Sequence, residues 1–375
     1  MADTASRGNS WYRIRNADEV NSPSLLVYPD RIEQNIMKMI SVAGNASRLW
    51  PHVKTHKMAE VVKMQMKFRI DKFKCATIAE AEMTAGCGAR EVLLAHQPVG
   101  PDIERFFTLI SEFPDVQFSC IADCSEVITQ LSDASLKHNK TSHVWLDINN
   151  GMNRTGIDPG KGAEELFTMI NESPGLRAEG LHVYDGHIHD HEYQQREKAC
   201  NEAFTPVEML EERLISITGI SPKIVAGGTP TFPVHAKRAG VGTSPGTTLL
   251  WDWGYARSFR DLGFLNAAVL MTRIISKPGK GLICTDLGHK AVGSEMPQPR
   301  AWFPDLGEYE IISHNEEHMV IWCGKEPSLK PGDLLYAIPV HICPTVDRYD
   351  SVTVVEDGIA TGQWEVSARK RKITI

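Results

Sequence analysis

The stretch "SRLWPHVKTHKMAEVVKMQMKFRIDKFKCATI" (residues 47–78) contains two short apolar runs separated by one helical segment. The first run, 47–53, and the second, 72–78, have the apolar and β-branched content of buried strands. Residues 58–68 lie between them and have the composition of a helix. A strand, a helix and a second strand in this order are typical of a parallel sheet built from βα repeats.

The same alternation continues to about residue 255 and yields eight predicted strands. Helical segments such as 79–87 and 192–218 separate them. Eight strands with intervening helices predict a (β/α)8 TIM barrel, and a doubly wound sheet is the alternative. The predicted strands are 47–53, 72–78, 91–96, 116–122, 142–148, 178–184, 222–227 and 247–252.

Strand-like runs broken by turns such as "KPGKG" replace the βα pattern after residue 260. They predict a smaller C-terminal all-β domain, to which the first 25 residues can add a strand. We therefore expect a barrel over residues 26–255, and a β domain made of residues 1–25 plus 256–375.

The overall composition excludes several classes of function. A net charge of −7 argues against a general affinity for nucleic acid or an anionic membrane surface. No apolar stretch reaches the roughly 20 residues needed to cross a bilayer, and the N-terminus has no apolar signal segment. The eight cysteines are scattered without a disulfide framework, so we expect a cytoplasmic protein with reduced thiols.

Chemistry in a barrel occurs at the C-terminal ends of its strands, and Lys54 follows the first predicted strand. A lysine at this position can form a Schiff base with an aldehyde cofactor once burial or a nearby cation frees its amine. His52 and His56 are polar neighbours that can tune it. The heptapeptide 51–57 alone favours a solvated basic loop.

Two glycine-containing turns late in the barrel resemble an anion cradle. Gly227, Gly228 and Thr229 follow the seventh predicted strand, and "SPGTT" (244–248) lies close behind in sequence. Bare backbone N–H groups and a hydroxyl at this end of a barrel are typical of a phosphate site, although Gly-Gly on its own is more often a turn.

The polar turns after the fifth and sixth strands supply further candidates. Arg154 in "NNGMNRTGI" can hold a phenolate or carboxylate oxygen. Tyr184 in "YDGHIHDH" can contact a ring cofactor. His187, His189 and His191 in that segment are candidate bases or metal partners, and Gly186 favours a loop over a continued strand.

A metal site is suggested by "PVHICP", which contains His341 and Cys343. If this segment is a strand, the two side chains share a face and can bind one ion. An imidazole with a thiolate favours zinc, with iron or cobalt also compatible, whereas manganese or magnesium would prefer a carboxylate. A strand with one buried cysteine and one hydrogen-bonded histidine is the simpler alternative.

The combination of "PHVKTHK", "NNGMNRTGI", "YDGH", "GGTP" and a late "HIC" resembles the fold type III enzymes that use pyridoxal 5'-phosphate (PLP). "GMNRTG" is similar to the turn of alanine racemase, and the order and spacing of all five most resemble the D-threonine aldolase and D-serine dehydratase family. The similarity extends from "SPSLLVYPDRIEQNI" to "DGIATGQWEVSAR".

This resemblance implies a cofactor, a metal and an assembly. It implies a head-to-tail homodimer acting on small D-amino acids, in which Lys54 carries PLP and Lys57 is second choice. It also implies a divalent metal, for which zinc is favoured, with manganese and magnesium as alternatives. The implied contacts are Arg154 and Tyr184 for the cofactor, Gly227, Gly228, Thr229, Gly246 and Thr247 for its phosphate, and His341 and Cys343 for the metal.

The resemblance leaves three activities open. Aldolases of the family usually have histidine-x-aspartate at the metal and dehydratases histidine-x-cysteine, and this chain has the cysteine. The tail and the histidine-rich "YDGHIHDH" are closer to the aldolases. We expect a D-threonine aldolase type of lyase in which Lys54, His187 and His189 are the catalytic candidates. A D-serine or D-3-hydroxyaspartate dehydratase and an amino-acid racemase are the alternatives.

Overall fold

The computed structural model describes residues 10–324 and 328–375, and these divide into two compact units. The barrel unit comprises residues 36–54, 58–248 and 367–375, and the β unit comprises residues up to 35, 55–57 and 249–366. The expected limits, 26–255 for the barrel and 1–25 plus 256–375 for the β domain, differ from these units at 26–35, 55–57, 249–255 and 367–375. Within the described ranges, no helix is both long and apolar enough to span a membrane.

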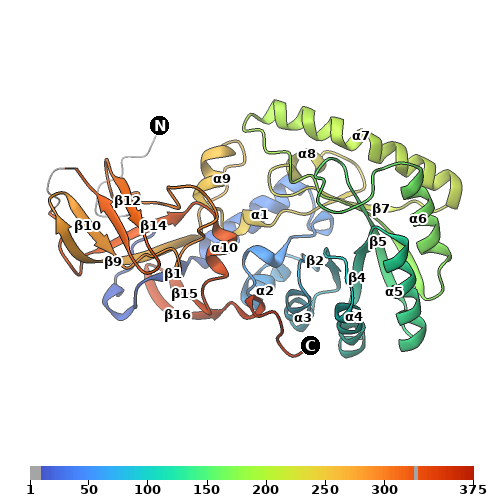
Figure 1. Ribbon diagram of the computed structural model, residues 1–375, viewed down its shortest axis with the longest axis horizontal. Coiled ribbons are helices and arrows are strands. Elements are labelled where there is room, and N and C mark those ends of the chain that lie inside the picture. The colour runs from blue at the N-terminus through green and yellow to red at the C-terminus, as the bar shows by residue number, and fades with distance from the viewer. Residues whose placement is uncertain (1–9, 325–327) are drawn as a thin grey trace. The chain divides into compact units, whose positions relative to one another are not determined.

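The barrel unit is built on a parallel seven-stranded sheet whose strands follow one another in chain order (Figure 1). Residues 49–52 join the two edges of this sheet, because Leu49 forms a parallel bridge with Thr243 and His52 forms one with Lys74. The sheet therefore curls into a closed ring. Its strands are β2 (Lys72–Cys75), β3 (Glu91–Leu94), β4 (Gln117–Ala122), β5 (Ser142–Ile148), β6 (Leu176–Val183), β7 (Lys223–Ala226) and β8 (Val241–Thr243).

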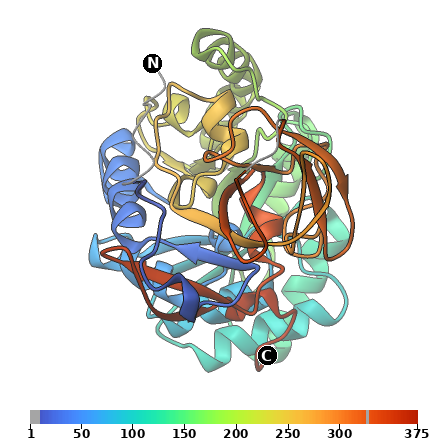
Figure 2. The ribbon, with the colours of Figure 1, turned by 90° about the vertical axis from the view of Figure 1, so that its left-hand side faces the viewer.

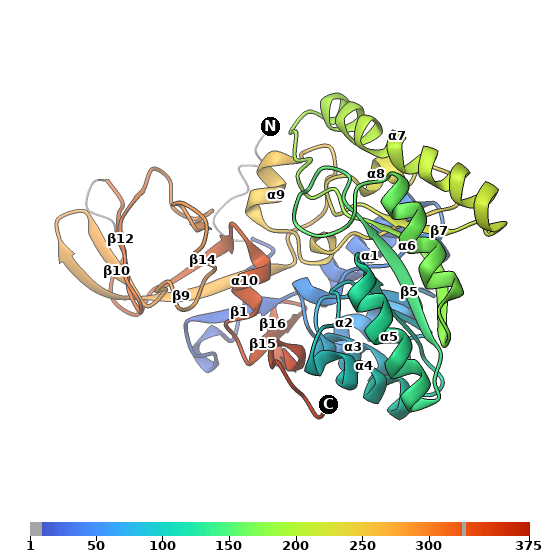
Figure 3. The same ribbon diagram turned by 45° about the vertical axis from the view of Figure 1, so that its right-hand side comes forward.

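Helices alternate with these strands and lie outside the ring, as Figure 3 shows for the segments after β4 and β5. Parallel neighbours need such crossover connections, and the covering helices leave the strands buried on both faces. The helices are α2 (Ala59–Lys67), α3 (Ile78–Gly86), α4 (Pro101–Glu112), α5 (Ser125–His138), α6 (Lys161–Glu172), α7 (Tyr193–Thr218) and α8 (Phe232–His235). Helix α1 (Pro29–Ala43) precedes them in the chain.

The inside of the ring contains a buried cluster formed by Trp50, Leu93, Ile121, Trp145 and Val225. The indole rings of Trp50 and Trp145 pack edge to face with their centroids 5.6 Å apart. Side chains two positions further along a strand share its face. The next inward layer therefore falls at the C-terminal ends of the strands, where the candidate site residues lie.

Two of the eight strand predictions are wrong in detail, and in both cases a proline explains the difference. Residues 47–53 form only isolated bridges between two 3-10 turns, η2 (Ala46–Arg48) and η3 (Val53–Thr55), because Pro51 has no N–H to donate to a ladder. The last strand is Val241–Thr243 and not 247–252, since Pro245 interrupts it. Residues Thr247–Leu249 form the 3-10 turn η4.

The β unit contains a nine-stranded mixed sheet, drawn mostly in orange and red in Figure 2. β1 (Ser24–Val27) lies between β9 and β15, so an N-terminal strand joins this sheet but extends two residues past the expected limit of 25. Residues 1–9 lie outside the described residues. The other strands are β9 (Ala268–Gly279), β10 (Leu282–Thr285), β11 (Ala301–Trp302), β12 (Glu310–His314), β13 (Met319–Trp322), β14 (Leu334–Pro339), β15 (Ser351–Glu356) and β16 (Ile359–Glu365).

Candidate functional site

Lys54 lies in η3, directly after the residues that close the barrel. Its side chain is partly exposed, and its backbone N–H donates to Nδ1 of His52 at 3.3 Å. Lys57, the second choice for the cofactor, belongs to the β unit, where its Nζ lies 3.9 Å from the Asp347 carboxylate. The two lysines of the opening motif are therefore held in different surroundings.

A second lysine of the barrel unit, Lys74 in β2, was missed in the sequence and is almost completely buried. Its Nζ lies 3.5 Å from Nε2 of His182 in β6. Nδ1 of His182 in turn lies 2.6 Å from the Asp147 carboxylate in β5. The available signal was a titratable residue in the apolar part of each strand, in "FKC", "LDI" and "LHV".

Burial changes the pKa values of Lys74, His182 and Asp147. Burial, followed by the positive charge of Lys54, lowers the pKa of Lys74 to about 7. Burial also lowers the pKa of the His182 imidazole. The pKa of Asp147 is lowered despite its burial, because its hydrogen bond with His182 and other favourable contacts outweigh desolvation.

Tyr184 and Arg154, both predicted to contact the cofactor, lie together. The guanidinium carbon of Arg154 is 4.8 Å from the centroid of the Tyr184 ring, and Nζ of Lys74 is 5.5 Å from it. Gly186 and Gly228 pack against this ring, since a Cβ at either position would come within 2.5 Å and 3.0 Å of its atoms. The ring therefore lies beside an amine, a guanidinium and two residues without side chains.

The predicted phosphate cradle consists of two loops that meet. The Thr229 hydroxyl accepts hydrogen bonds from the backbone N–H groups of Gly246 and Thr247, both at 3.0 Å. Gly227 has a φ of +80°, which other residues rarely adopt. The buried hydroxyl of Thr243, at the end of β8, has no hydrogen-bond partner within the described parts of the chain. Converging loops and a glycine backbone suit a bound phosphate.

A buried hydrogen-bond network supports the first of these loops. Asp185 accepts hydrogen bonds from the Thr231 hydroxyl at 2.7 Å and from Nε2 of His235 at 2.8 Å. The Thr231 oxygen accepts the Gly228 N–H at 3.1 Å. The Cys200 thiol lies 3.6 Å from Asp185, and burial raises the pKa of this thiol to about 12. Asp185, Cys200 and His235 are close enough to one another to ligate a metal. Their hydrogen bonds instead indicate that they support the loop structurally.

The histidines after β6 lie in a loop, as Gly186 suggested. His187 packs on the turn that precedes Arg154, because a Cβ on Gly151 would lie 2.7 Å from its Nε2. Nδ1 of His187 and the amide of Asn150 are buried, and neither has a hydrogen-bond partner in the described ranges. A buried polar group without a hydrogen-bond partner costs folding free energy unless a ligand supplies the partner. Asn150 was not among the site residues predicted from the sequence. His189 and His191 are exposed.

The segment with His341 and Cys343 is not a strand, so the predicted reason for their proximity is wrong. β14 ends at Pro339, His341 caps the short helix α10 (Ile342–Val346), and Cys343 lies in its first turn. Pro344 is tolerated there but would interrupt a strand ladder.

His341 and Cys343 nevertheless interact through a side-chain hydrogen bond. Nδ1 of His341 lies 2.5 Å from the Glu295 carboxylate, and the Cys343 thiol lies 3.3 Å from the Thr55 hydroxyl. Burial alone would lower the pKa of His341, but Cys343, Glu295 and Asp252 raise it to about 9. An imidazole, a thiol and a carboxylate at one point suit a divalent metal such as zinc.

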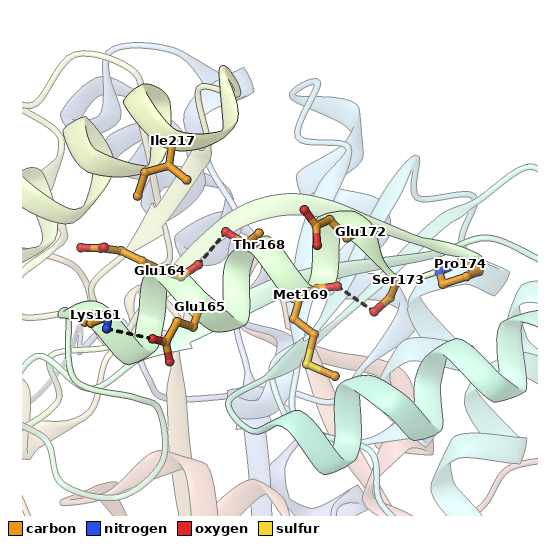
Figure 4. Close-up of a pocket in the computed structure, with 9 residues that line it drawn as sticks. All are labelled: Lys161, Glu164, Glu165, Thr168, Met169, Glu172, Ser173, Pro174 and Ile217. Carbon is orange, nitrogen blue, oxygen red and sulfur yellow. Dashed lines mark hydrogen bonds and ion pairs between the residues drawn. The ribbon is translucent and has the colours of Figure 1, made fainter.

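An open surface pocket of about 570 Å³ lies elsewhere in the barrel unit, along α6 (Figure 4). It is lined mainly by acidic and aliphatic side chains, among them Glu164, Glu165 and Ile217. None of the predicted site residues lines it. This pocket is therefore separate from the candidate site.

Two family models match the chain. Residues 27–241 match "Alanine racemase, N-terminal domain", and residues 267–355 match a serine dehydratase domain. The first match covers most of the barrel unit and includes every site residue predicted there except Gly246 and Thr247. The second covers His341 and Cys343.

Relatives of known activity match along nearly the whole chain. A D-threonine aldolase of Arthrobacter sp is 27% identical over 93% of each chain. The crystal structure of D-threonine aldolase from Filomicrobium marinum has a TM-score of 0.87 and 26% identity over 95% of this chain and 98% of that one. D-threo-3-hydroxyaspartate dehydratase from Delftia sp. HT23 shares the fold, with a TM-score of 0.80 and 20% identity over 92% and 97% of the two chains. A cysteine-to-alanine variant of a D-threo-3-hydroxyaspartate dehydratase has been solved in a metal-free form.

Proposed function

Because the chain belongs to the D-threonine aldolase and D-serine dehydratase family of fold type III lyases, which share the alanine racemase N-terminal domain, we propose that it cleaves D-3-hydroxy-amino acids. The proposed products are glycine and an aldehyde, and the proposed cofactors are PLP and a divalent metal. The observation that carries the aldolase assignment is similarity to D-threonine aldolases across both parts of the chain, at higher identity than to the dehydratase.

The barrel unit supplies the groups that would hold PLP. Lys54 offers the amine for covalent attachment, and the loops at Gly227–Thr229 and Gly246–Thr247 offer the phosphate cradle. Tyr184 and Arg154 offer a ring contact and a cation for the phenolic oxygen. Bound PLP acts as an electron sink for negative charge at the α-carbon of an amino acid.

The β unit supplies the groups that would hold the metal. His341 and Cys343 are the proposed ligands, with zinc favoured by the thiolate. A metal held by these residues would supply Lewis-acid chemistry toward the 3-hydroxyl group of a substrate. His187, whose buried Nδ1 has no hydrogen-bond partner in the described parts of the chain, is the better candidate to take the hydroxyl proton, and exposed His189 is the second. We further propose the head-to-tail homodimer that the family resemblance implies.

Dehydration is the second candidate function, and one specific observation favours it. The metal pair here is histidine-x-cysteine, as expected for the dehydratases, and the Delftia dehydratase is 22% identical over 92% of this chain. In that reaction Lys54 would take the α-proton, and a metal held by His341 and Cys343 would supply the Lewis acid for departure of the hydroxyl group. Racemisation is a third route and requires no metal.

Metal dependence separates these candidates. We expect the PLP-loaded enzyme to act on D-threonine, D-serine and D-3-hydroxyaspartate, to lose this activity in EDTA, and to regain it on addition of zinc or manganese. Full activity after chelation would exclude the metal role of His341 and Cys343 and would favour a racemase.

Replacing Gly227 with alanine should destabilise the protein and weaken PLP binding. The new Cβ would lie 2.7 Å from the His235 ring, and the φ of +80° is strained for alanine. Together these effects should cost about 2 kcal/mol or more of stability and shift the loop that carries Thr229. The readouts are the thermal unfolding midpoint without PLP and the Kd for PLP, which should rise by about tenfold or more.

Gly86→Ala is the matched control for this substitution. Gly86 is the last residue of α3, and a Cβ there would meet no atom within 4 Å. Its stability and its Kd for PLP should stay close to the wild-type values. Equal losses in both variants would show that glycine replacement in general, and not the cradle, is responsible.

A further inference from the structure

Three titratable side chains inside the barrel form a buried line that the proposed reaction does not use. Lys74, His182 and Asp147 come from three different strands, and each is only 3% exposed. Asp147 and His182 are direct partners in the register of β5 and β6. The Asp147 carboxylate also accepts a hydrogen bond from the Thr155 hydroxyl at 2.8 Å, which fixes it in place.

The protonation of this line follows from its surroundings. Asp147 is ionised because its pKa is lowered, and His182 is neutral because burial lowers its pKa. The neutral imidazole therefore donates its Nδ1–H to Asp147 and offers the lone pair of Nε2 to Lys74. A neutral amine that donates one N–H to Nε2 keeps its own lone pair free to accept a proton.

The amine of Lys74 is suited to exchange protons near neutral pH. Burial lowers the pKa of Lys74 most, and the cations of Lys54 and Arg154 lower it further. The carboxylates of Asp147 and Asp185 raise it, and the resulting pKa is about 7. A lysine poised at this value is effective as both acid and base. Nζ also lies 5.5 Å from the Tyr184 ring, where the cofactor is proposed to bind.

We propose that Lys74 is a second proton-transfer group of this site, positioned by His182 and Asp147, which exchanges the α-hydrogen of a bound amino acid. The proposal rests on the proposed function for the presence of PLP. The bond between the α-carbon and its hydrogen breaks, the proton moves to Nζ of Lys74, and the electron pair stays at the α-carbon. Return of a proton from the ammonium group restores the amino acid, so no oxidant or reductant is needed.

This assignment predicts an activity beyond cleavage. An amino acid without a 3-hydroxyl group, such as glycine or D-alanine, cannot be cleaved but still has an α-hydrogen. In D2O the enzyme should replace that hydrogen with deuterium. The rate should rise with pH through about 7, because the neutral form of Lys74 is the one that accepts the proton.

The first test measures the charge of Lys74 directly and does not depend on turnover. In the full chain labelled with ¹³Cε-lysine, one resonance should titrate near pH 7 and should be absent in Lys74→Met. Its midpoint should rise in Lys54→Met, which removes a cation, and fall in Asp147→Asn, which removes an anion. Lys72→Met, on the same face of β2, should leave the signal in place. A Lys74 signal that titrates close to 10.5, with the ordinary lysines, would overturn the proposal.

The second test follows deuteration of glycine by the PLP-loaded enzyme. Lys74→Met should slow it by about tenfold or more and should remove the rise through neutral pH, while the absorbance of bound PLP is retained. Unchanged exchange in a Lys74→Met enzyme that binds PLP would overturn the proposal alone. A different outcome would overturn the proposed function alone. In that case deuterium exchange would depend on Lys74, but the enzyme would release no glycine from D-threonine.

Discussion

Replacing Lys54 with alanine is expected to abolish covalent attachment of PLP and to lower kcat by about 10⁴-fold or more, the scale typical for loss of a covalent catalytic group. Lys54 directly follows the residues that close the barrel, beside His52 and within electrostatic reach of Lys74. Borohydride reduction followed by peptide mass mapping should find the pyridoxyl group on Lys54 in the wild type. The absorbance of bound cofactor near the visible edge should be lost in the variant.

Lys57→Ala is the matched control, because it removes an amine from the same short motif. Lys57 lies 3.9 Å from Asp347, and loss of this loose pair should change stability by less than about 1 kcal/mol. Covalent PLP and most activity should remain. A pyridoxyl group on Lys57 or Lys74 in the wild-type enzyme would contradict the assignment of Lys54.

Replacing Cys343 with alanine is expected to remove the bound metal and to lower kcat by about 100-fold or more, since even residues that merely orient metal ligands often contribute 10- to 100-fold. The Cys343 thiol interacts with His341 and lies 3.3 Å from the Thr55 hydroxyl. Metal content by mass spectrometry should fall from about one ion per chain to near zero. PLP binding should persist, because the proposed cofactor contacts belong to the barrel unit.

Cys323→Ala is the control for this substitution, since Cys323 is another partly exposed cysteine of the β unit. It should keep both metal and activity. A Cys343→Ala enzyme that retains a full complement of metal would show that the ion binds elsewhere.

The barrel could be predicted because its inner strands are apolar runs with helices between them. The first and last strands could not, since Pro51 and Pro245 remove ladder hydrogen bonds in ways that apolar content does not reveal. The β unit shows the same limit, because "PVHICP" has strand composition but turns into α10 after Pro339.

The candidate site residues on loops could be proposed because glycine, arginine, tyrosine and histidine stand out after each strand. The buried groups were missed for a physical reason. Lys74 and His182 lie far apart in sequence and meet only because a closed ring directs both toward its interior. Asp185 and His235 likewise appear unremarkable until β6 and α8 bring them together behind Gly228.

Carbon–carbon cleavage of a D-3-hydroxy-amino acid is the reaction that we propose for this protein. The most direct test is the product of D-threonine with enzyme loaded with PLP and metal, with L-threonine as the control. We predict equal amounts of glycine and acetaldehyde from D-threonine and neither from L-threonine. Formation of 2-oxobutanoate and ammonia in place of glycine would contradict the claim and would identify a dehydratase.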